Sequence, residues 1–188
     1  MSYLNIDELG EFGFKYVGKD VKISSKASIY NASELEVGDF SRIDDFCVVS
    51  GKVRIGRNVH ITPGCLVAGG TEGIIFEDFT TLAYHVQVFT QSDDYSGLTM
   101  TNSTIPSKYK NELKAAVAIK KHSIVGAGSV IMPGVTLNEG TSVGAMSLVM
   151  QDTQAWGIYV GSPAKRIKER SRDLQALESL YREENGLV

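Results

Sequence analysis

The 188-residue sequence lacks several features that would point to particular classes of protein. It has only two cysteines, too few for the disulfide scaffold of a small secreted domain. No stretch approaches the roughly 18 apolar residues of a membrane span, and the N-terminus has neither the basic start nor the apolar run of a signal peptide. The formal net charge of -3 gives no reason to expect a nucleic-acid partner. These absences favour a folded cytoplasmic protein.

What the sequence does contain is an aliphatic residue at every sixth position. The clearest series consists of Ile119, Val125, Ile131, Leu137, Val143 and Val149. Four positions after each of these stands a small or β-branched residue. A period of six fits neither an α-helix nor a sustained strand alternation. It fits a triangular coil of three six-residue sides.

The residue types indicate how such a coil would be built. The aliphatic residue points inward, the small residue occupies a tight inner corner, and Gly, Asn and Asp turn the chain on the outside. Neighbouring coils would pair as parallel strands about 4.8 Å apart. One coil cannot bury its own aliphatic residues, but a stack of coils can. The sequence therefore predicts an all-β stack of coils.

The period divides the chain into three parts. Residues 1–16 carry no repeat and are expected to be an irregular N-terminal cap. The repeat covers residues 17–155 and is interrupted by residues 93–118, which hold no aliphatic series. A break of this length indicates a loop extruded from the tube, and such loops usually carry function. Residues 156–188 form a C-terminal tail.

Both ends of the chain carry apolar side chains outside the repeat. We expect Phe12, Phe14 and Tyr16 to cap the open end of the stack. The tail is expected to end in a short amphipathic helix that serves for packing or for an oligomer contact. Its predicted apolar stripe consists of Leu174, Leu177, Leu180 and Tyr181.

The two cysteines, Cys47 and Cys65, are eighteen residues apart, which is one full coil. Both follow an aliphatic residue of the series by four positions, so both side chains should point inward. We expect a pair of small buried thiols. A disulfide or a metal site is the alternative, and the lack of further cysteines argues against both.

The tail also carries the segment Gly161-Ser162-Pro163-Ala164-Lys165-Arg166-Ile167-Lys168. Together with the repeat and the extruded loop, it resembles the hexapeptide-repeat acyltransferases, in particular those that acetylate sugars. The resemblance covers residues 17–170. It implies a left-handed parallel β-helix, an exception to the usual right-handed crossover. It also implies a homotrimer in which acetyl-CoA and acceptor meet between subunits, each cleft closed by one subunit's extruded loop.

The resemblance further implies a CoA site along the last coils, where small side chains let the pantetheine arm lie against the turns. The matching positions are Ala127, Ala145, Met150 and Gln151. The basic positions after the terminal proline are matched by Lys165 and Lys168, with Arg166 between them. Cations at these positions would meet the phosphates of CoA. The alternative is an ordinary solvated basic run.

The acceptor site departs from the family pattern. In the sugar O-acetyltransferases, a histidine at the start of the extruded loop is the general base, but Asp93 stands at that position here, followed by Asp94 and Tyr95. Three explanations compete. One of the aspartates acts as a weak base or holds an acceptor amine; an amino-sugar acceptor needs little help from a base; or His60 replaces the missing histidine. The aspartates are alternatively only a turn start. We expect Tyr95 and His85 to contact the acceptor.

These residues favour N-acetylation over O-acetylation, because a carboxylate suits an ammonium group better than it suits the deprotonation of a hydroxyl. The predicted function is acetyl-CoA-dependent N-acetylation of a nucleotide-linked amino-deoxy sugar in surface polysaccharide biosynthesis, without a metal. Sugar O-acetylation is the close alternative. A non-catalytic scaffold would not need the residues of the CoA positions.

A γ-class carbonic anhydrase is a remote alternative, built on the same helix. It would need three histidine ligands, two of them commonly spaced H-x-x-x-x-H. The three histidines here, His60, His85 and His122, include no such pair. We expect His122 to be a solvated corner residue.

Overall fold

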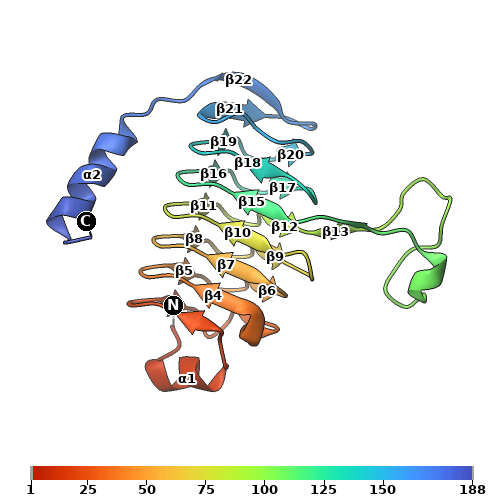
Figure 1. The fold of residues 1–188 in the computed structure, drawn as a ribbon, viewed down its shortest axis with the longest axis horizontal. Coiled ribbons are helices and arrows are strands. Elements are labelled where there is room, and N and C mark those ends of the chain that lie inside the picture. Colours follow the sequence, from red (N-terminus) through yellow and green to blue (C-terminus); the bar gives the residue numbers. More distant parts are fainter. Residues whose placement is uncertain (1, 188) are drawn as a thin grey trace.

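The computed structural model describes residues 2–187 as a tube of stacked coils with two attachments (Figure 1). An extruded loop projects from one side of the tube, and a C-terminal helix lies along the opposite side. The chain winds from the N-terminal end to the C-terminal end as a left-handed parallel β-helix, which confirms the predicted fold.

Three sheets form the sides of the tube. The first sheet holds β1 (Tyr16–Val17), β4 (Leu35–Val37), β7 (Val53–Ile55), β10 (Ile74–Phe76), β15 (Val117–Ile119) and β18 (Thr136–Leu137). The second holds β2 (Lys22–Ile23), β5 (Arg42–Ile43), β8 (His60–Ile61), β11 (Thr81–Leu82), β16 (Ile124–Val125), β19 (Ser142–Val143), β21 (Gly157–Val160) and β22 (Lys165–Glu169). The third holds β3 (Ser28–Ile29), β6 (Val48–Ser50), β9 (Leu66–Ala68), β12 (Gln87–Phe89), β17 (Val130–Ile131) and β20 (Leu148–Val149). All these pairings are parallel except that of β21 with β22.

The aliphatic residues of the six-residue series form the interior. From Val37 to Val149, every one of them is at most 2% exposed. The small residues four positions later are buried too, from Ser123 at 1% to Thr153 at 3%. Their hydroxyls bond to the backbone inside the tube; Ser129 Oγ, for example, donates to the Gly144 carbonyl at 2.9 Å. The predicted inward pattern is therefore confirmed.

The corner between the first and second sheets, which we call the first corner, departs from the expectation. Gly, Asn and Asp were expected to turn the chain, yet Phe79, His122 and Trp156 have φ values of 59°, 63° and 58°. This conformation costs a residue other than glycine about 1–2 kcal/mol. The rings offset part of that cost by stacking, since the Phe79 and His122 centroids are 5.6 Å apart.

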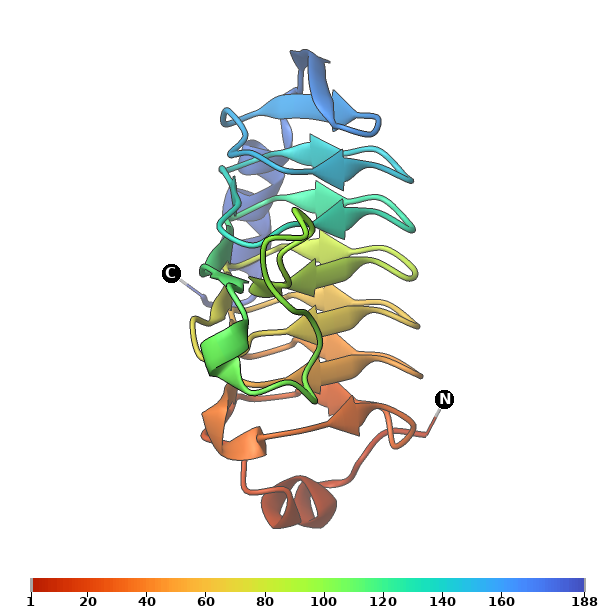
Figure 2. The ribbon, with the colours of Figure 1, turned by 90° about the vertical axis from the view of Figure 1, so that its right-hand side faces the viewer.

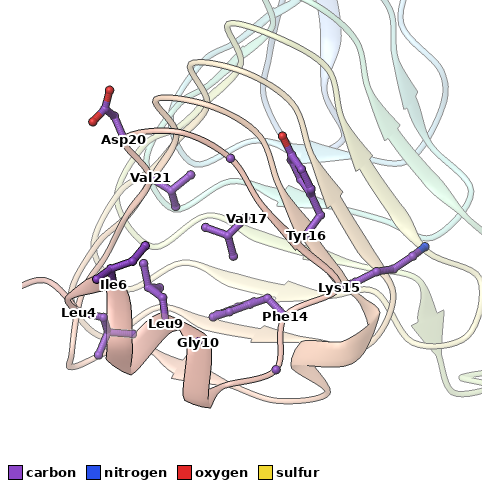
Figure 3. Close-up of a pocket in the computed structure, with 12 residues that line it drawn as sticks. Leu4, Ile6, Leu9, Gly10, Phe14, Lys15, Tyr16, Val17, Asp20 and Val21 are labelled. Atoms are coloured by element: carbon purple, nitrogen blue, oxygen red, sulfur yellow. The ribbon is translucent and has the colours of Figure 1, made fainter.

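The N-terminal end is more regular than expected. Residues 1–16 include α1 (Ile6–Glu11), which begins at an Asn5 capping box completed by Glu8. Leu9 of this helix is buried beneath the first coil. A cavity of about 700 Å³ lies there, and Figure 3 shows Leu9 and Phe14 pointing into it.

The expectation for the aromatic cap is only partly met. Phe14 packs against the core. Phe12 stacks on Phe14 with ring centroids 5.6 Å apart, and Tyr16 lines the cavity, but these two side chains are 41% and 54% exposed. In a strand, successive side chains point to opposite faces. Val17 therefore takes the inward position, and Tyr16 lines only the edge of the cavity (Figure 3).

The extruded loop is an ordered arm, which we define as residues 91–114 (Figures 1 and 2). Its base is an antiparallel ribbon of β13 (Gln91–Ser92) and β14 (Leu113–Lys114). It leaves the tube between the third and first sheets, and β15 resumes the coil at Val117. Two 3₁₀ turns complete the elements, η1 (Ala32–Glu34) in the second coil and η2 (Ser107–Tyr109) in the arm.

The C-terminal helix α2 (Leu174–Glu184) lies against the first corner. Tyr181 accepts a hydrogen bond from Asn58 Nδ2 at 3.1 Å, and Glu178 bonds to His122. The outer part of the predicted apolar stripe has no cover, because Leu177 and Leu180 are 65% and 54% exposed. Within residues 2–187, no helix has the length and apolar character needed to cross a membrane.

Candidate functional site

Asp93 and Asp94 directly follow β13 and lie on the arm. The Ser96 backbone N–H donates to Asp94 Oδ1 at 2.8 Å, and the Thr99 hydroxyl donates to Oδ2 at 2.9 Å. The hydrogen bonds from Ser96, followed by that from Thr99, hold the pKa of Asp94 below its ordinary value. Asp94 is therefore a fixed, ionised carboxylate, suited to hold a cation and poorly suited to take a proton.

The neighbours of Asp94 are less constrained. Asp93 Oδ2 accepts one hydrogen bond, from the Asn102 N–H at 3.3 Å. Tyr95 is 91% exposed and points its ring to solvent. The aspartate pair does begin a turn, which was the alternative interpretation of these two residues. Its position on a projecting arm nevertheless leaves both carboxylates within reach of a bound molecule or a neighbouring chain.

His60 lies on the outer face of the second sheet, away from the arm of its own chain. Its Nε2 is 2.9 Å from Asp44 Oδ2, and Arg42 Nε donates to Asp44 Oδ1 at 2.5 Å. Asp44 is 2% exposed, so its carboxylate is held between the two basic side chains. A carboxylate that orients a histidine is the arrangement of a general base. The same contacts also serve to join neighbouring coils.

The corner between the second and third sheets, which we call the second corner, carries three of the proposed contact residues. His85 has a positive φ of 58° and lies with its ring over Gly64, where a Cβ would meet Nδ1 at 2.3 Å. Ala127 and Ala145 lie one coil apart at the same corner. Gly126 packs so closely that an added Cβ would come within 2.4 Å of the Ala145 nitrogen. Neighbouring coils therefore pack closely at this corner, and Ala127 and Ala145 add only small side chains to it.

Three of the predicted CoA residues meet in one cavity near the last coil. Met150, Gln151 and Lys165 line a volume of about 370 Å³, together with Tyr159 and Pro163. Tyr159 fixes this region by accepting a hydrogen bond from the Gln154 N–H at 2.7 Å. The Ser162–Pro163 peptide is cis.

The basic run Lys165, Arg166 and Lys168 is part of β22, which folds back on β21 and is exposed throughout. Arg166 is paired with Glu169 at 2.6 Å. No described residue within 4.0 Å forms an ion pair with Lys165 or Lys168. These two lysines are the cations of the run that a phosphate could contact.

The structure does not bring all candidate residues together within one chain. The CoA candidates lie at the second corner and along the last coil, His60 lies on the second sheet, and the aspartates lie on the arm. The assignments of these site residues remain predictions.

The expectation for His122 is wrong. It is buried under α2, with Nε2 2.7 Å from Glu178 Oε2. Burial alone would raise the pKa of Glu178, but the hydrogen bonds from Lys121 and Arg182 outweigh it and lower the pKa to about 2. Sequence gave no signal for this contact, because positions 122 and 178 are far apart in the chain.

Both cysteines are buried and neither forms a disulfide, as expected. Cys47 Sγ donates to the Thr62 carbonyl at 3.1 Å, and Cys65 Sγ donates to the Ala83 carbonyl at 3.2 Å. Contact with Cys65 and burial raise the pKa of Cys47, so its thiol is unreactive. Between residues 2 and 187, no group of three His, Cys, Asp or Glu side chains is placed to hold a metal ion.

Known proteins share both the repeat and the fold. The family model for the bacterial transferase hexapeptide (six repeats) matches residues 34–69. A dTDP-4-amino-4,6-dideoxy-D-glucose acyltransferase of Escherichia coli is 40% identical over 185 residues, which cover 97% of this chain and 96% of that protein.

Two solved structures are similar over nearly the whole chain. One is AntD, an N-acyltransferase from Bacillus cereus, in complex with dTDP and 3-hydroxybutyryl-CoA; it is 43% identical, covers 98% of each chain and has a TM-score of 0.97. The other is a serine-to-alanine variant of AntD with dTDP-4-amino-4,6-dideoxyglucose and coenzyme A, 44% identical, covering 97% of this chain and 98% of that one, with a TM-score of 0.96. On the strength of the full-length relative and the repeat, the chain belongs to the hexapeptide-repeat acyltransferases, enzymes that use CoA thioesters.

Proposed function

We propose that this enzyme transfers an acyl group from CoA to the amino group of a dTDP-linked 4-amino-4,6-dideoxy sugar. The observation that carries the proposal is the fixed, ionised carboxylate of Asp94 on the arm. It directly follows Asp93, which stands where an O-acetyltransferase of this family would carry a histidine. The near full-length likeness to proteins that act on or bind this class of sugar supports the same assignment. The product would serve surface polysaccharide biosynthesis.

The chemistry suits a site without a strong base. Asp94 and Asp93 attract the acceptor ammonium group and orient it, and the group gives one proton to solvent water before it attacks. The nitrogen lone pair then adds to the thioester carbonyl, the tetrahedral oxyanion collapses, and the C–S bond breaks. The departing thiolate takes up the second proton from nitrogen, which leaves an amide and free CoA. The carboxylates supply position rather than proton removal.

The CoA donor would lie on the second corner and the last coil. Backbone at Ala127 and Ala145 would face the pantetheine arm, and the cavity of Met150 and Gln151 would receive its continuation. Lys165 and Lys168 would contact phosphate oxygens, with Arg166 beside them. Acetyl-CoA remains the proposed donor. The assay below compares it with a CoA thioester that carries a different acyl group.

We further propose a homotrimer working in the cytoplasm, where CoA thioesters and nucleotide sugars are made. An apolar ladder on the outer face of the third sheet supports assembly. Its members are Val48 and Leu66 on two neighbouring coils and Val130 and Leu148 on two others, all half-buried in a single chain, with the exposed Gln87 on the coil between the two pairs. Such a stripe on an outer face is typical of a subunit interface. In a trimer, the arm of one chain would close the site of the next, with His85 and Tyr95 near the acceptor.

Sugar O-acetylation is the second candidate, and one observation favours it. The pairing of His60 with buried Asp44 would orient a histidine as a general base for a hydroxyl. Because Nε2 of His60 is already committed to Asp44, only Nδ1 remains to act. We place this candidate second for that reason.

The test is an acyl-transfer assay that follows thiol release. Acceptors are dTDP-4-amino-4,6-dideoxyglucose and its 4-hydroxyl counterpart, each with acetyl-CoA and with 3-hydroxybutyryl-CoA. We expect turnover with the amine alone, a large loss in Asp93→Asn, and little change in His60→Ala. Turnover of the hydroxyl sugar that is lost in His60→Ala would overturn the proposal in favour of O-acetylation.

A further inference from the structure

The arm presents apolar side chains to solvent although its backbone is well held. Leu98 is 88% exposed and Met100 is 53% exposed, beside the equally open Tyr95. Met100 N–H donates to the Tyr109 carbonyl at 3.0 Å, which ties the two sides of the tip together. We call Leu98 and Met100 the arm tip. A rigid apolar projection of this kind is a preformed contact surface, because little entropy is lost when it docks.

A groove with matching chemistry lies between α2 and the second sheet. Its volume is about 400 Å³. Apolar atoms of Ile124, Leu174, Leu177 and Tyr181 line it. We call it the helix groove. Leu177 is 65% exposed at its rim, and Ile124 is 39% exposed on the sheet side.

One acidic side chain near each surface is already paired with two basic side chains of its own chain. At the helix groove, Glu178 contacts Lys121 at 2.8 Å and Arg182 at 2.5 Å. In the arm, Glu112 contacts Lys110 at 2.8 Å and Lys114 at 3.1 Å. Arg170, which also lines the groove, donates to the carbonyls of His122 and Gly140 at 2.7 and 3.0 Å. These charged groups can therefore keep their partners when the two surfaces dock, which lowers the usual cost of burying charge.

The positions of the two surfaces suit copies arranged in a ring. The arm and α2 lie on opposite sides of the tube, and both span the height of the middle coils (Figure 1). Rotation about an axis parallel to the tube keeps every element at its own height. In a closed ring, each chain offers one patch to one neighbour and a different patch to the other. The arm of one copy can thus meet α2 of the next at the same level.

We propose that the helix groove of one chain receives the arm tip of the neighbouring chain. This inference rests on the proposed trimer, and it assigns a role to the C-terminal helix, which carries none of the proposed site residues. Docking of the tip would hold the base of the arm, with Asp93 and Asp94, over the neighbour's second sheet. The helix then acts as a clamp that completes an active site shared between two chains.

Cysteine crosslinking tests the contact directly. The native cysteines, Cys47 and Cys65, are buried and leave the surface free of thiols. A chain carrying Leu98→Cys and Leu177→Cys should form covalent oligomers under mild oxidation, two thiols losing two electrons and two protons to the added oxidant. The matched control carries Leu98→Cys and Ser179→Cys, because Ser179 is exposed on α2 but does not line the groove.

A docked pair has an effective concentration in the millimolar range, so the Leu177 pair should crosslink about tenfold faster than the control. Equal rates would overturn the proposal. Amide exchange provides a second measurement that needs no disulfide: Leu177→Asp should speed exchange in residues 95–100, and Ser179→Asp should not. Unchanged exchange in Leu177→Asp would also contradict docking.

Acyl transfer is measured on the same wild-type preparation, which separates the two proposals. An active enzyme with equal crosslinking rates would retain the proposed function and refute the clamp. Fast crosslinking at Leu177 without amine turnover would support the clamp and refute the proposed substrate.

Discussion

The tube and the arm of this molecule are built by different means. In the tube, every sixth residue is apolar and, from Val37 to Val149, at most 2% exposed. This repeated burial holds the coils together. In the arm, Leu98 is open to solvent, and the backbone is held by side chains such as Asp94, Thr99 and Glu112. Periodic burial provides stability, whereas local polar contacts provide a shape that can meet a ligand or another chain.

The largest effect should come from a cavity in the tube. Leu82 is completely buried in the coil next to the arm, and Leu82→Ala should reduce the free energy of unfolding by about 2–5 kcal/mol. Tyr95→Ala, at a residue that is 91% exposed on the arm, should change it by about 0.5 kcal/mol or less. Urea unfolding at one fixed protein concentration measures both. Similar losses in the two variants would show that the arm shares the stability of the tube.

The same contrast explains which parts of the fold are readable in the sequence. Burial in the tube repeats every six residues, so the strands, the inward-facing cysteines and the site of the break could all be predicted. Helix α1 was missed although its capping pair, Asn5 and Glu8, is a local signal. A segment without the six-residue repeat can therefore still hold a regular helix.

Contacts on the outside of the tube have no such period. The burial of His122 depends on Glu178, which arrives from a helix 56 positions later. The pairing of His60 with Asp44 joins two coils across 16 positions. The residues of the first corner are equally hard to predict from the sequence, because bulky rings there adopt the positive φ that glycine, asparagine and aspartate usually adopt. These features arise from packing between distant segments, and the candidate site is distributed among them.

The second expected effect is a loss of activity, without a loss of stability, when a carboxylate of the arm is changed. Asp94→Asn should lower kcat/KM for the amino sugar roughly 100-fold, the size of effect expected when a reacting group loses its position. Its urea midpoint should match that of the wild type. Thr99→Ala removes one hydrogen bond to the carboxylate but keeps its charge, and we expect a smaller loss. An equal loss in both variants would mean that Asp94 only shapes the arm.

Acid should loosen the arm before it affects the tube. Hydrogen bonds from Lys110 and Lys114 lower the pKa of Glu112 to about 2. Because this folded-state value is depressed, the ion pairs stabilise the arm fully above the ordinary pKa of 4.5 and are lost as the pH falls towards 2.

Amide exchange of the arm, compared between wild type and Glu112→Gln, measures this effect. The two proteins should differ at neutral pH and converge near pH 2. The coils should show no such difference. A gap between the proteins that persists at the lowest pH would indicate that the variant changes the arm by some route other than charge.

The smallest effect should come from an ion pair on the outside of the tube. Lys120 Nζ lies 2.8 Å from Glu77 Oε1, and both side chains are 39% exposed. Exposed pairs contribute about 0.2–1 kcal/mol and are screened by salt, so Lys120→Ala should reduce the unfolding free energy by no more than that. Glu77 keeps its hydrogen bond from the Lys121 N–H, which leaves its carboxylate partnered. Urea unfolding at low and high salt checks both points. A loss comparable to that of Leu82→Ala would mean that the outer surface, and not only the buried series, holds the coils together.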